Sequence, residues 1–399
     1  MPNNRTGISI PKKISKKTLN KLVNFSSVLA EILKRSIVEP DKALRWTIIA
    51  NPSAGGFTIN KRWKKHQDAL NSTFEKIKNN PVRTKANPSN ICQNINFAGQ
   101  NADDHIKRLG SFGLIPTFGP GDAAKISAML LEEMAGESGT FYLFITAGGD
   151  GTSLEVLQTL FRASPALRGR YAIFRLPLGT GNDGAEAWEM LDALKLFIEP
   201  ARIELKPGLL LTSGTGKTWP GGEPLLAFNI LSVGVDAFVT HMTNKMKGKL
   251  PGDSYKLWVD IAALFYDLLY KVDFMDVKGF DENNREIKNF REKLILCCMG
   301  ISGHRSYGSH KMILPDDRNV CAIKQMPLYR KLIIKELFSS GGHADKKEAI
   351  LFNAAKIEIS GKYPILAQMD GEAVRLEAKD FPITIELTKP VIPVLKLIN

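Results

Sequence analysis

The order of apolar runs and polar breaks in the first half of the chain is typical of alternating strands and helices. Four short apolar runs have the length and the β-branched or aromatic content of buried strands: 45–50, 113–117, 141–145 and 171–176. Each run ends in a glycine-bearing break, and helical spacing follows, as at Leu154, Leu157 and Leu160. The alternation predicts a three-layer α/β domain with a largely parallel sheet over residues 45–198.

The pattern changes after residue 198. Short strand-like runs, separated by Gly, Pro and Asp, recur at 202–205, 208–212, 225–231, 293–299, 319–325, 355–360, 363–368 and 382–387. Their spacing predicts an antiparallel, β-sandwich-like domain over residues 199–388. One helix is expected within it, at 255–272, and its apolar face suits an ordinary core helix better than the lining of a lipid pocket.

The two ends of the chain are expected to lie outside these domains. Residues 1–44 form a basic N-terminal extension with five lysines ahead of and along an amphipathic stretch. Such a stretch is either a helix on a membrane surface or a helix packed on the domain with a solvated lysine face, and we favour the second. Residues 389–399 form a C-terminal tail that can return to the N-terminal domain.

The charge and the cysteines narrow the class of protein. A formal net charge of +13 favours anionic partners such as acidic lipids or nucleotides, or else a generally solvated basic surface. Basic residues do not alternate with aromatic ones, so nucleic acid is not expected as a partner. The four cysteines lack zinc-ligand spacing and indicate reduced core residues: Cys92, Cys297, Cys298 and Cys321. With no signal-like or membrane-spanning apolar segment, we expect a cytoplasmic protein with peripheral membrane association.

The central stretch Gly148-Gly149-Asp150-Gly151-Thr152 carries the strongest chemical signal. Its glycines let backbone amides approach a ligand, and a helix that begins there offers an anion site. Thr152 and Ser153 are residue types that cap such a helix. Because the Asp150 carboxylate would repel a bare phosphate, we interpret it as a partner of Mg²⁺ or of a substrate hydroxyl. A turn without a ligand is the alternative.

Two other glycine patterns are misleading. Residues 179–184 match the dinucleotide-binding pattern after a strand, but no strand with an acidic end follows about 20 residues later. The segment Gly214-Thr215-Gly216-Lys217-Thr218 resembles the end of a phosphate-binding P-loop. It lacks the first glycine of that pattern and the helix that should follow, so we predict a hairpin loop.

Five segments in this order resemble the diacylglycerol kinase catalytic family, which includes sphingosine and ceramide kinases and bacterial lipid kinases. The segments are Asn51-Pro52-Ser53-Ala54-Gly55-Gly56, 117–123, Gly148-Gly149-Asp150-Gly151-Thr152, 177–183 and Asp370-Gly371-Glu372. The resemblance covers residues 45–390, and the segments at 229–237 and 247–250 also match. It implies an N-terminal α/β domain, a C-terminal β-sandwich-like domain, and ATP in the cleft between them.

The resemblance also implies a reaction. An ATP-dependent lipid kinase would transfer the γ-phosphoryl group to the hydroxyl of a lipid alcohol, of the diacylglycerol or sphingoid type, at the membrane surface. Its nucleotide contacts would be Asn51, Pro52, Ser53, Gly55, Thr117, Gly148, Gly149, Asp150, Gly151, Thr152, Thr180, Asn182 and Asp183. Asp370 or Glu372 would be the general base, with Asp150 close to Mg²⁺ and the phosphates. These residue types suit phosphoryl transfer, which needs positioning, charge neutralisation and a proton acceptor.

The chain departs from the family in two places. The run Tyr307-Gly308-Ser309-His310 lacks the triple glycine that is frequent there. In bacterial members an acidic turn binds a structural Mg²⁺, and here the corresponding turn carries Asp316 and Asp317 but also Arg318. Asp316 and Asp317 are therefore candidate metal ligands that Arg318 argues against.

Two other functions stay open. A kinase of a soluble acceptor, similar to NAD kinase, shares Gly-Gly-Asp-Gly, but the segments at 51–56 and 177–183 point away from it. A non-catalytic lipid- or nucleotide-binding relative is disfavoured because Asp150, Asp370 and Glu372 are all present. The sequence leaves open the identity of the lipid alcohol and the oligomeric state, a homodimer included.

Overall fold

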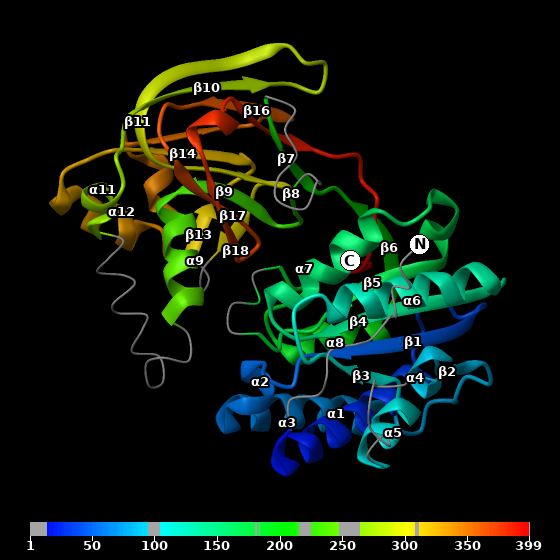
Figure 1. The fold of residues 1–399 in the computed structure, drawn as a ribbon. Helices are drawn as coiled ribbons and strands as arrows, with labels where there is room; N and C mark the ends of the chain where they lie inside the picture. Colours follow the sequence, from blue (N-terminus) through cyan, green and yellow to red (C-terminus); the bar gives the residue numbers. More distant parts are fainter. Residues whose placement is uncertain are drawn as a thin grey trace, which may run out of the picture. The chain divides into compact units, whose positions relative to one another are not determined.

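The computed structural model describes residues 14–94, 104–179, 182, 184–214, 225–246, 264–307 and 311–398. The backbone divides into two compact units, and each is described by itself (Figure 1). The first unit runs to Lys206 and regains the chain at Val391–Asn399, and the second is Pro207–Pro390. The division thus lies after Lys206, whereas the sequence predicts a boundary after residue 198.

In chain order, the first unit contains α1 (Lys16–Lys34), β1 (Ala43–Ala50), α2 (Gly55–Thr58), α3 (Asn60–Ile77), β2 (Ala86–Pro88), α4 (Ile91–Asn94), α5 (Asp104–Ser111), β3 (Leu114–Pro116), α6 (Asp122–Gly136), β4 (Thr140–Ala147), α7 (Asp150–Phe161), η1 (Pro165–Arg170), β5 (Tyr171–Arg175), α8 (Met190–Ile198), β6 (Ala201–Lys206) and β20 (Ile392–Leu397). The strands β1, β4 and β5 are buried almost throughout, as expected for a sheet that is covered on both faces.

The first sheet has the strand order β2-β1-β4-β5-β20-β6, and β3 also pairs with β1. The strands β1, β4 and β5 are parallel, and the register pairs the last residues of β1 and β4, Ala50 and Ala147. The loops that follow these strands therefore leave from one edge of the sheet. At the other side β20 runs parallel to β5 and antiparallel to β6, so the C-terminal segment completes this sheet. That pairing explains why β6 belongs to the first unit.

Helix α1 is part of the first unit's core. Leu22, Phe25 and Leu29 are fully buried, and the ring of Phe25 meets that of Phe57 edge to face at 5.3 Å. The Ser15 hydroxyl caps the helix by accepting a hydrogen bond from the Thr18 amide at 3.2 Å. The interpretation as a helix packed on the domain is confirmed for residues 16–34.

The second unit contains β7 (Leu209–Ser213), β8 (Leu225–Ala227), β9 (Ile230–Gly234), α9 (Val235–Met246), α11 (Tyr266–Leu269), β10 (Phe274–Phe280), β11 (Glu286–Gly300), β12 (Arg305–Tyr307), β13 (Lys311–Leu314), β14 (Val320–Lys324), α12 (Leu328–Leu337), η2 (Gly342–Asp345), β15 (Ala349–Phe352), β16 (Lys356–Ser360), β17 (Ile365–Met369), β18 (Glu372–Leu376), η3 (Ala378–Asp380) and β19 (Ile383–Leu387).

One curled antiparallel sheet dominates the second unit. The long strand β11 joins its two parts, because its first half pairs with β10 and its second half with β9 and β14. A single hydrophobic cluster takes side chains from both parts, for example Val277 and Ile357 from one and Val233 and Ala367 from the other. The sheet therefore encloses its own core, and the predicted α/β domain followed by a sandwich-like β domain is confirmed.

Some local features differ from the expectations. Of the helix predicted at 255–272, residues 255–263 lie outside the described residues, and over 264–272 the structure has the short helix α11, on which Leu268 is 79% exposed rather than buried in a core. Helix α12 and strand β10 were not predicted from the pattern. The four cysteines are buried and reduced, as expected. Among the helices that the structure describes, none combines the length and the apolar character needed to cross a bilayer.

Candidate active site

The loop that follows β1 is folded on itself and on the loop that follows β5. Asn51 Oδ1 accepts a hydrogen bond from the Ser53 amide at 2.9 Å, which closes a tight Asx turn around the buried Pro52. Gly55 then opens the short helix α2. The Gly56 amide donates to the Leu178 carbonyl at 2.9 Å, and a Cβ on Gly56 would lie only 2.4 Å from Leu178 Cδ2. This glycine is therefore needed for close packing of two loops.

The loop that follows β4 opens α7 earlier than the sequence suggests. The helix begins at Asp150, and its N-cap is Gly149, which has no side chain to cap it. The prediction of Thr152 and Ser153 as caps was wrong, because both lie inside the first turns. The Ser153 hydroxyl instead meets the Thr146 hydroxyl at 2.9 Å, and Thr152 fills the space that a Cβ on Gly148 would need.

Gly149 differs from Gly148 and Gly179 in the space that a side chain would have at its position. A Cβ on this residue would find no heavy atom within 4 Å. The start of α7 therefore presents backbone to open space, with Gly151 and Thr152 in the same first turn as Asp150. An uncapped helix start with a partial positive charge is a binding site for phosphate groups.

The loop that follows β5 packs against the loop that follows β4. A Cβ on Gly179 would lie 3.0 Å from Gly149 Cα and 2.9 Å from Asn182 Oδ1. Asn182 has a φ of 61°, in the left-handed region that asparagine tolerates. The Arg62 guanidinium donates to the Gly179 carbonyl at 3.4 Å, which places a cation beside these backbones. The predicted contacts Thr180 and Asp183, with Gly181, lie outside the described residues.

The loop that follows β3 is built differently. The Thr117 amide donates to the Ala50 carbonyl at 2.8 Å, which ties this loop to the end of β1. The carboxylate of Asp122 is fully buried and accepts the amides of Phe118 and Gly119 at 2.8 and 2.9 Å. Glu155, from α7, accepts the amides of Gly121 and Ala123 at 2.8 and 3.1 Å. The chain's own carboxylates thus occupy the start of α6.

Two further polar groups support the loops, and the sequence reading missed both. Lys21 on α1 is buried, and its ammonium donates to the Phe57 carbonyl at 2.6 Å and to Asn60 Oδ1 at 3.1 Å, at the junction of α2 and α3. Burial, with the nearby charge of Lys17, lowers the pKa of Lys21. No local pattern indicates this role, because the bonded residues lie 36 and 39 positions away.

Arg175, at the end of β5, forms a buried ion pair with Glu186. The guanidinium donates to Glu186 Oε1 at 3.0 and 2.9 Å, and the Arg175 amide donates to Oε2 at 2.6 Å. The Glu186 side chain is only 2% exposed. The pair fastens the segment after Asn182 back to the sheet.

In the second unit, the segment Asp370-Gly371-Glu372 is the turn between β17 and β18. Asp370 and Gly371 have φ angles of 46° and 95°. The Asp370 carboxylate accepts hydrogen bonds from three successive amides, Phe228, Asn229 and Ile230, the last two at 3.0 Å each. Asp370 thus holds the turn between β8 and β9, whereas Glu372 is exposed at the start of β18.

The polar residues around this turn form one network within the second unit. The buried Gln368 accepts the Gly371 amide at 3.1 Å and donates to Asp236 Oδ2 at 3.1 Å. The Ser232 hydroxyl donates to the same oxygen at 2.7 Å. The structure therefore brings Asp236, from the segment at 229–237, close to the turn of Asp370 and Glu372.

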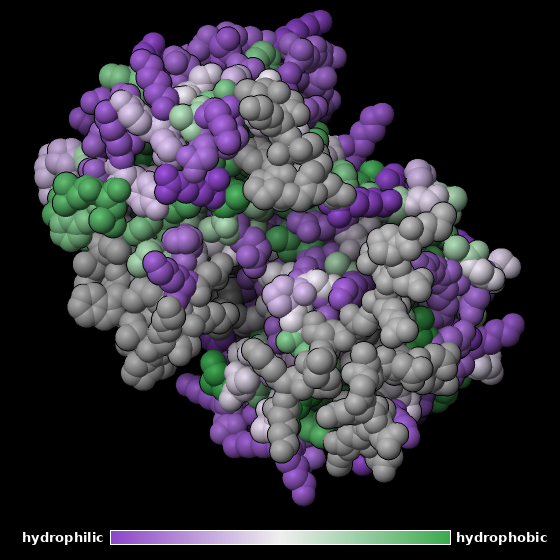
Figure 2. Space-filling model, viewed as in Figure 1, coloured by the Kyte–Doolittle hydropathy of each residue, from purple (hydrophilic) through white to green (hydrophobic). Residues whose placement is uncertain are grey.

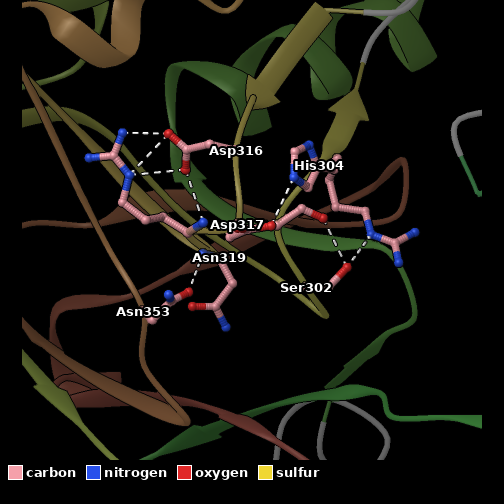
Figure 3. A network of polar contacts seen from close by, with 9 residues as sticks. Ser302, His304, Asp316, Asp317, Asn319 and Asn353 are labelled. Carbon is pink, nitrogen blue, oxygen red and sulfur yellow. Dashed lines mark hydrogen bonds and ion pairs between the residues drawn. The ribbon is translucent and has the colours of Figure 1, made fainter.

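Two side chains of the chain itself, Arg318 and His304, contact the acidic turn at Asp316 and Asp317 (Figure 3). The Arg318 guanidinium binds both carboxylate oxygens of Asp316, with Nε at 2.9 and 3.1 Å, and lowers the pKa of that carboxyl to about 2. His304 Nε2 lies 2.9 Å from Asp317 Oδ1. This arrangement does not suit a structural Mg²⁺, because the Arg318 guanidinium already binds the carboxylate oxygens of Asp316 that a metal would need as ligands.

Within the described ranges, no group of three or more His, Cys, Asp and Glu side chains could hold a metal ion alone. Asp150 is the first residue of α7 and follows Gly149 directly. One carboxylate next to a phosphate site suits Mg²⁺, which is usually held by one or two carboxylates together with substrate phosphates.

The comparisons with known proteins agree with this geometry. Residues 45–204 match the sequence profile of the family described as "Diacylglycerol kinase catalytic domain". This part of the chain belongs to that family. Kinases of the diacylglycerol kinase catalytic family use ATP, and the matched residues lie within the first unit. The match starts at the residue where the sequence predicts the α/β domain to start, and it ends within β6.

Solved structures match nearly the whole chain. A candidate diacylglycerol kinase of Bacillus anthracis str. Sterne is 16% identical over 89% of this chain and 97% of its own, with a TM-score of 0.52, which shows a shared fold. A second structure of a candidate diacylglycerol kinase from that organism is 16% identical over 88% of this chain and 97% of its own, with a TM-score of 0.49. A yeast NADH kinase is 12% identical over 88% and 83%, with a TM-score of 0.39. The last two likenesses are too weak to carry an argument. No curated protein matches the sequence significantly.

Proposed function

We propose that this protein is an ATP-dependent lipid kinase that transfers the γ-phosphoryl group of ATP to the hydroxyl of a lipid alcohol. One observation carries the proposal: the loops after β1, β4 and β5 pack against one another at the sheet edge, beside an uncapped helix start. Ligands bind at this edge in α/β sheets. The family of residues 45–204 supplies the reaction class.

The nucleotide phosphates would bind at the start of α7. There the backbone of Gly149 faces open space, and Arg62 adds a positive charge beside Gly179. The adjoining loop at Asn51 and Ser53 would contact the rest of the nucleotide. Asp150 would hold Mg²⁺, which supplies charge neutralisation between the phosphates when it is bound.

For the proton acceptor we favour Glu372 over Asp370. The Asp370 carboxylate already accepts three backbone amides, so its lone pairs serve the turn between β8 and β9. Glu372 is exposed two residues later, on the same turn. We therefore propose Glu372 as the general base for the acceptor hydroxyl and Asp370 as the residue that positions its turn.

The reaction would take place on an anionic membrane surface. The net charge of +13 supports this location, since each well-placed basic residue contributes about 1 kcal/mol to binding of an acidic bilayer. A kinase of a soluble acceptor is the second candidate function. Identifying the molecule that receives the phosphoryl group distinguishes it from a lipid kinase.

The test uses the purified full chain, Mg²⁺ and γ-labelled ATP over vesicles that carry a panel of lipid alcohols, with Asp150→Asn alongside. We expect a labelled lipid whose formation falls by a factor of about 10²–10⁴ in the variant, because the metal ligand is lost. Label in a soluble alcohol such as NAD, with none in any lipid, would contradict lipid kinase activity.

The same assay separates the two acidic residues of the turn. Glu372→Gln is expected to lower kcat by a factor of about 10²–10⁴ and to leave the melting temperature unchanged. Asp370→Asn is expected to lower the melting temperature, because three buried amides lose their charged acceptor. Full activity in Glu372→Gln would exclude it as the base.

A further inference from the structure

Helix α12 of the second unit exposes apolar side chains on its outward side and buries a lysine on its inward side. Its inward side carries Lys331, which is only 8% exposed, beside the buried Ile334. Its outward side carries Leu328, Tyr329, Leu332 and Ile333, with exposures between 44% and 65%. A surface helix in water normally turns its apolar stripe inward.

Ion pairs keep α12 in this orientation against α11. The Lys331 ammonium lies 2.6 Å from Asp267 Oδ1 and donates to the Leu264 carbonyl at 3.1 Å. Arg330 binds both carboxylate oxygens of Glu348 at 2.8 Å. On α11, Leu268 and Leu269 are 79% and 61% exposed. Charged contacts thus fix the helices from within while leucines are presented outward.

Together these residues form an apolar tip, defined as Leu268, Leu269, Leu328, Tyr329, Leu332 and Ile333. Figure 2 shows hydrophobic side chains gathered where Figure 1 places α11 and α12. Exposed apolar patches of this kind mark surfaces that bind another protein, a ligand or a membrane. The residues around the tip indicate which of these it is.

Basic and aromatic side chains border the apolar tip. The Lys271 ammonium, just after α11, lies 4.0 Å from the centre of the Tyr363 ring. Lys293 lies 5.3 Å from the centre of the Phe274 ring, and Phe274 is 45% exposed. Lys293 is next to α11, because its carbonyl accepts the amide of Gln325, whose side chain donates to Asp267. Leucines surrounded by lysines and aromatic rings match the interface of an acidic bilayer.

We propose that the apolar tip inserts into the surface of an anionic lipid bilayer, with Lys271 and Lys293 at the headgroups. This inference rests on the proposed function and names the surface by which the kinase would reach its lipid. A second copy of the chain is a poorer occupant, since a symmetric contact would set the same lysines against one another.

The test is flotation of the full chain with vesicles of equimolar phosphatidylcholine and phosphatidylglycerol, without ATP. The variant is Leu268→Asp with Leu332→Asp. The matched control is Leu205→Asp with Ile287→Asp, which alters residues 47% and 50% exposed elsewhere and adds the same charge. We expect vesicle affinity to fall at least about tenfold in the variant, because two leucines no longer insert, and about twofold or less in the control.

Two further measurements test whether the apolar tip inserts into the bilayer. Lys271→Gln with Lys293→Gln is expected to weaken binding to these vesicles but not to pure phosphatidylcholine. Leu268→Trp keeps an apolar side chain, and its fluorescence should be quenched by brominated lipid if the tip inserts. Equal binding by the Asp variant and the control, or no additional quenching, would overturn the proposal, as would conversion of a dimer to a monomer with vesicle binding unchanged.

The outcome is independent of catalysis. Asp150→Asn is expected to float with vesicles as the wild type does. If the wild-type chain floats with vesicles but forms no labelled lipid, the kinase proposal is refuted and the apolar tip is not. Labelled lipid with equal flotation of the Asp variant and the control would refute the apolar tip alone.

Discussion

Helices α6 and α7 begin alike in sequence and differently in structure. Each follows a parallel strand, and each opens on a Gly-Asp pair, Gly121-Asp122 or Gly149-Asp150. At α6 the amides around the helix start are bound by Asp122 and by Glu155. At α7 the N-cap is a glycine that has no side chain to cap the helix, and a Cβ on Gly149 would meet nothing within 4 Å.

The difference teaches where an anion can bind. A helix start attracts phosphate only while its amides and its dipole are not already satisfied by a carboxylate of the chain. Glu155 lies on α7 itself, so the same helix that presents the open site also closes its neighbour. The same Gly-Asp pair thus has a structural role at the start of α6 and a proposed phosphate-binding role at the start of α7.

The largest effect on stability is expected at the closed helix start. Asp122→Ala should lower the free energy of unfolding by about 2–4 kcal/mol, because the amides of Phe118 and Gly119 lose a buried charged acceptor. The matched control is Asp192→Ala, which removes a surface pair with Lys195 and should cost less than about 1 kcal/mol. Urea unfolding measures both, and equal stability of the two variants would break the comparison.

A pair of glycine substitutions tests the open side. Gly56→Ala should cost about 1–3 kcal/mol, since its Cβ would lie 2.4 Å from Leu178 Cδ2. Gly149→Ala should change stability by less than about 1 kcal/mol, because its Cβ points into empty space.

The two glycine variants should differ again when ATP is added. A methyl group on Gly149 would occupy the space proposed for phosphate, so the rise in melting temperature caused by ATP should shrink in Gly149→Ala. Thermal melts with and without ATP and Mg²⁺ give both quantities. An unchanged ATP-induced shift would move the phosphate site away from Gly149.

A pH dependence of stability is expected at α3, the helix that carries Arg62. Burial lowers the pKa of His66 from 6.5 to about 4. The unfolded chain therefore binds a proton more readily than the folded one between these values, and stability should fall as pH decreases from 6.5 to 4. His66→Gln should remove most of that loss. Urea unfolding of the wild type and of His66→Gln at several pH values measures this difference. If the stability of both proteins changed with pH in the same way, the prediction would be contradicted.

The strands and the glycine loops were predictable because their signals are local. Apolar runs of strand length end in glycines, and those loops leave from the edge where β1, β4 and β5 end. The resemblance added the order of the segments and the candidate residues Asp150, Asp370 and Glu372. These statements depend on neighbouring residues or on motif order, which a single sequence contains.

The partners of the polar groups were not predictable, because they lie far apart in the chain. Glu155 bonds to an amide 34 residues before it, and Asp370 to amides 140 or more residues before it. The same holds for the last strand, β20, which joins β5 and β6. The wrong assignment of Thr152 and Ser153 as caps has a similar cause, since contacts with Gly148 and Thr146 decided their positions.

The sequence by itself therefore determined the α/β and β units, the glycine loops and the acidic residues available for catalysis. Only the tertiary structure decided which helix start is closed and which is open, which acid supports a turn, and which leucines of α11 and α12 face outward. The physical reason is that local propensity sets the elements, whereas buried charges and hydrogen bonds are satisfied by whatever groups the fold brings within reach.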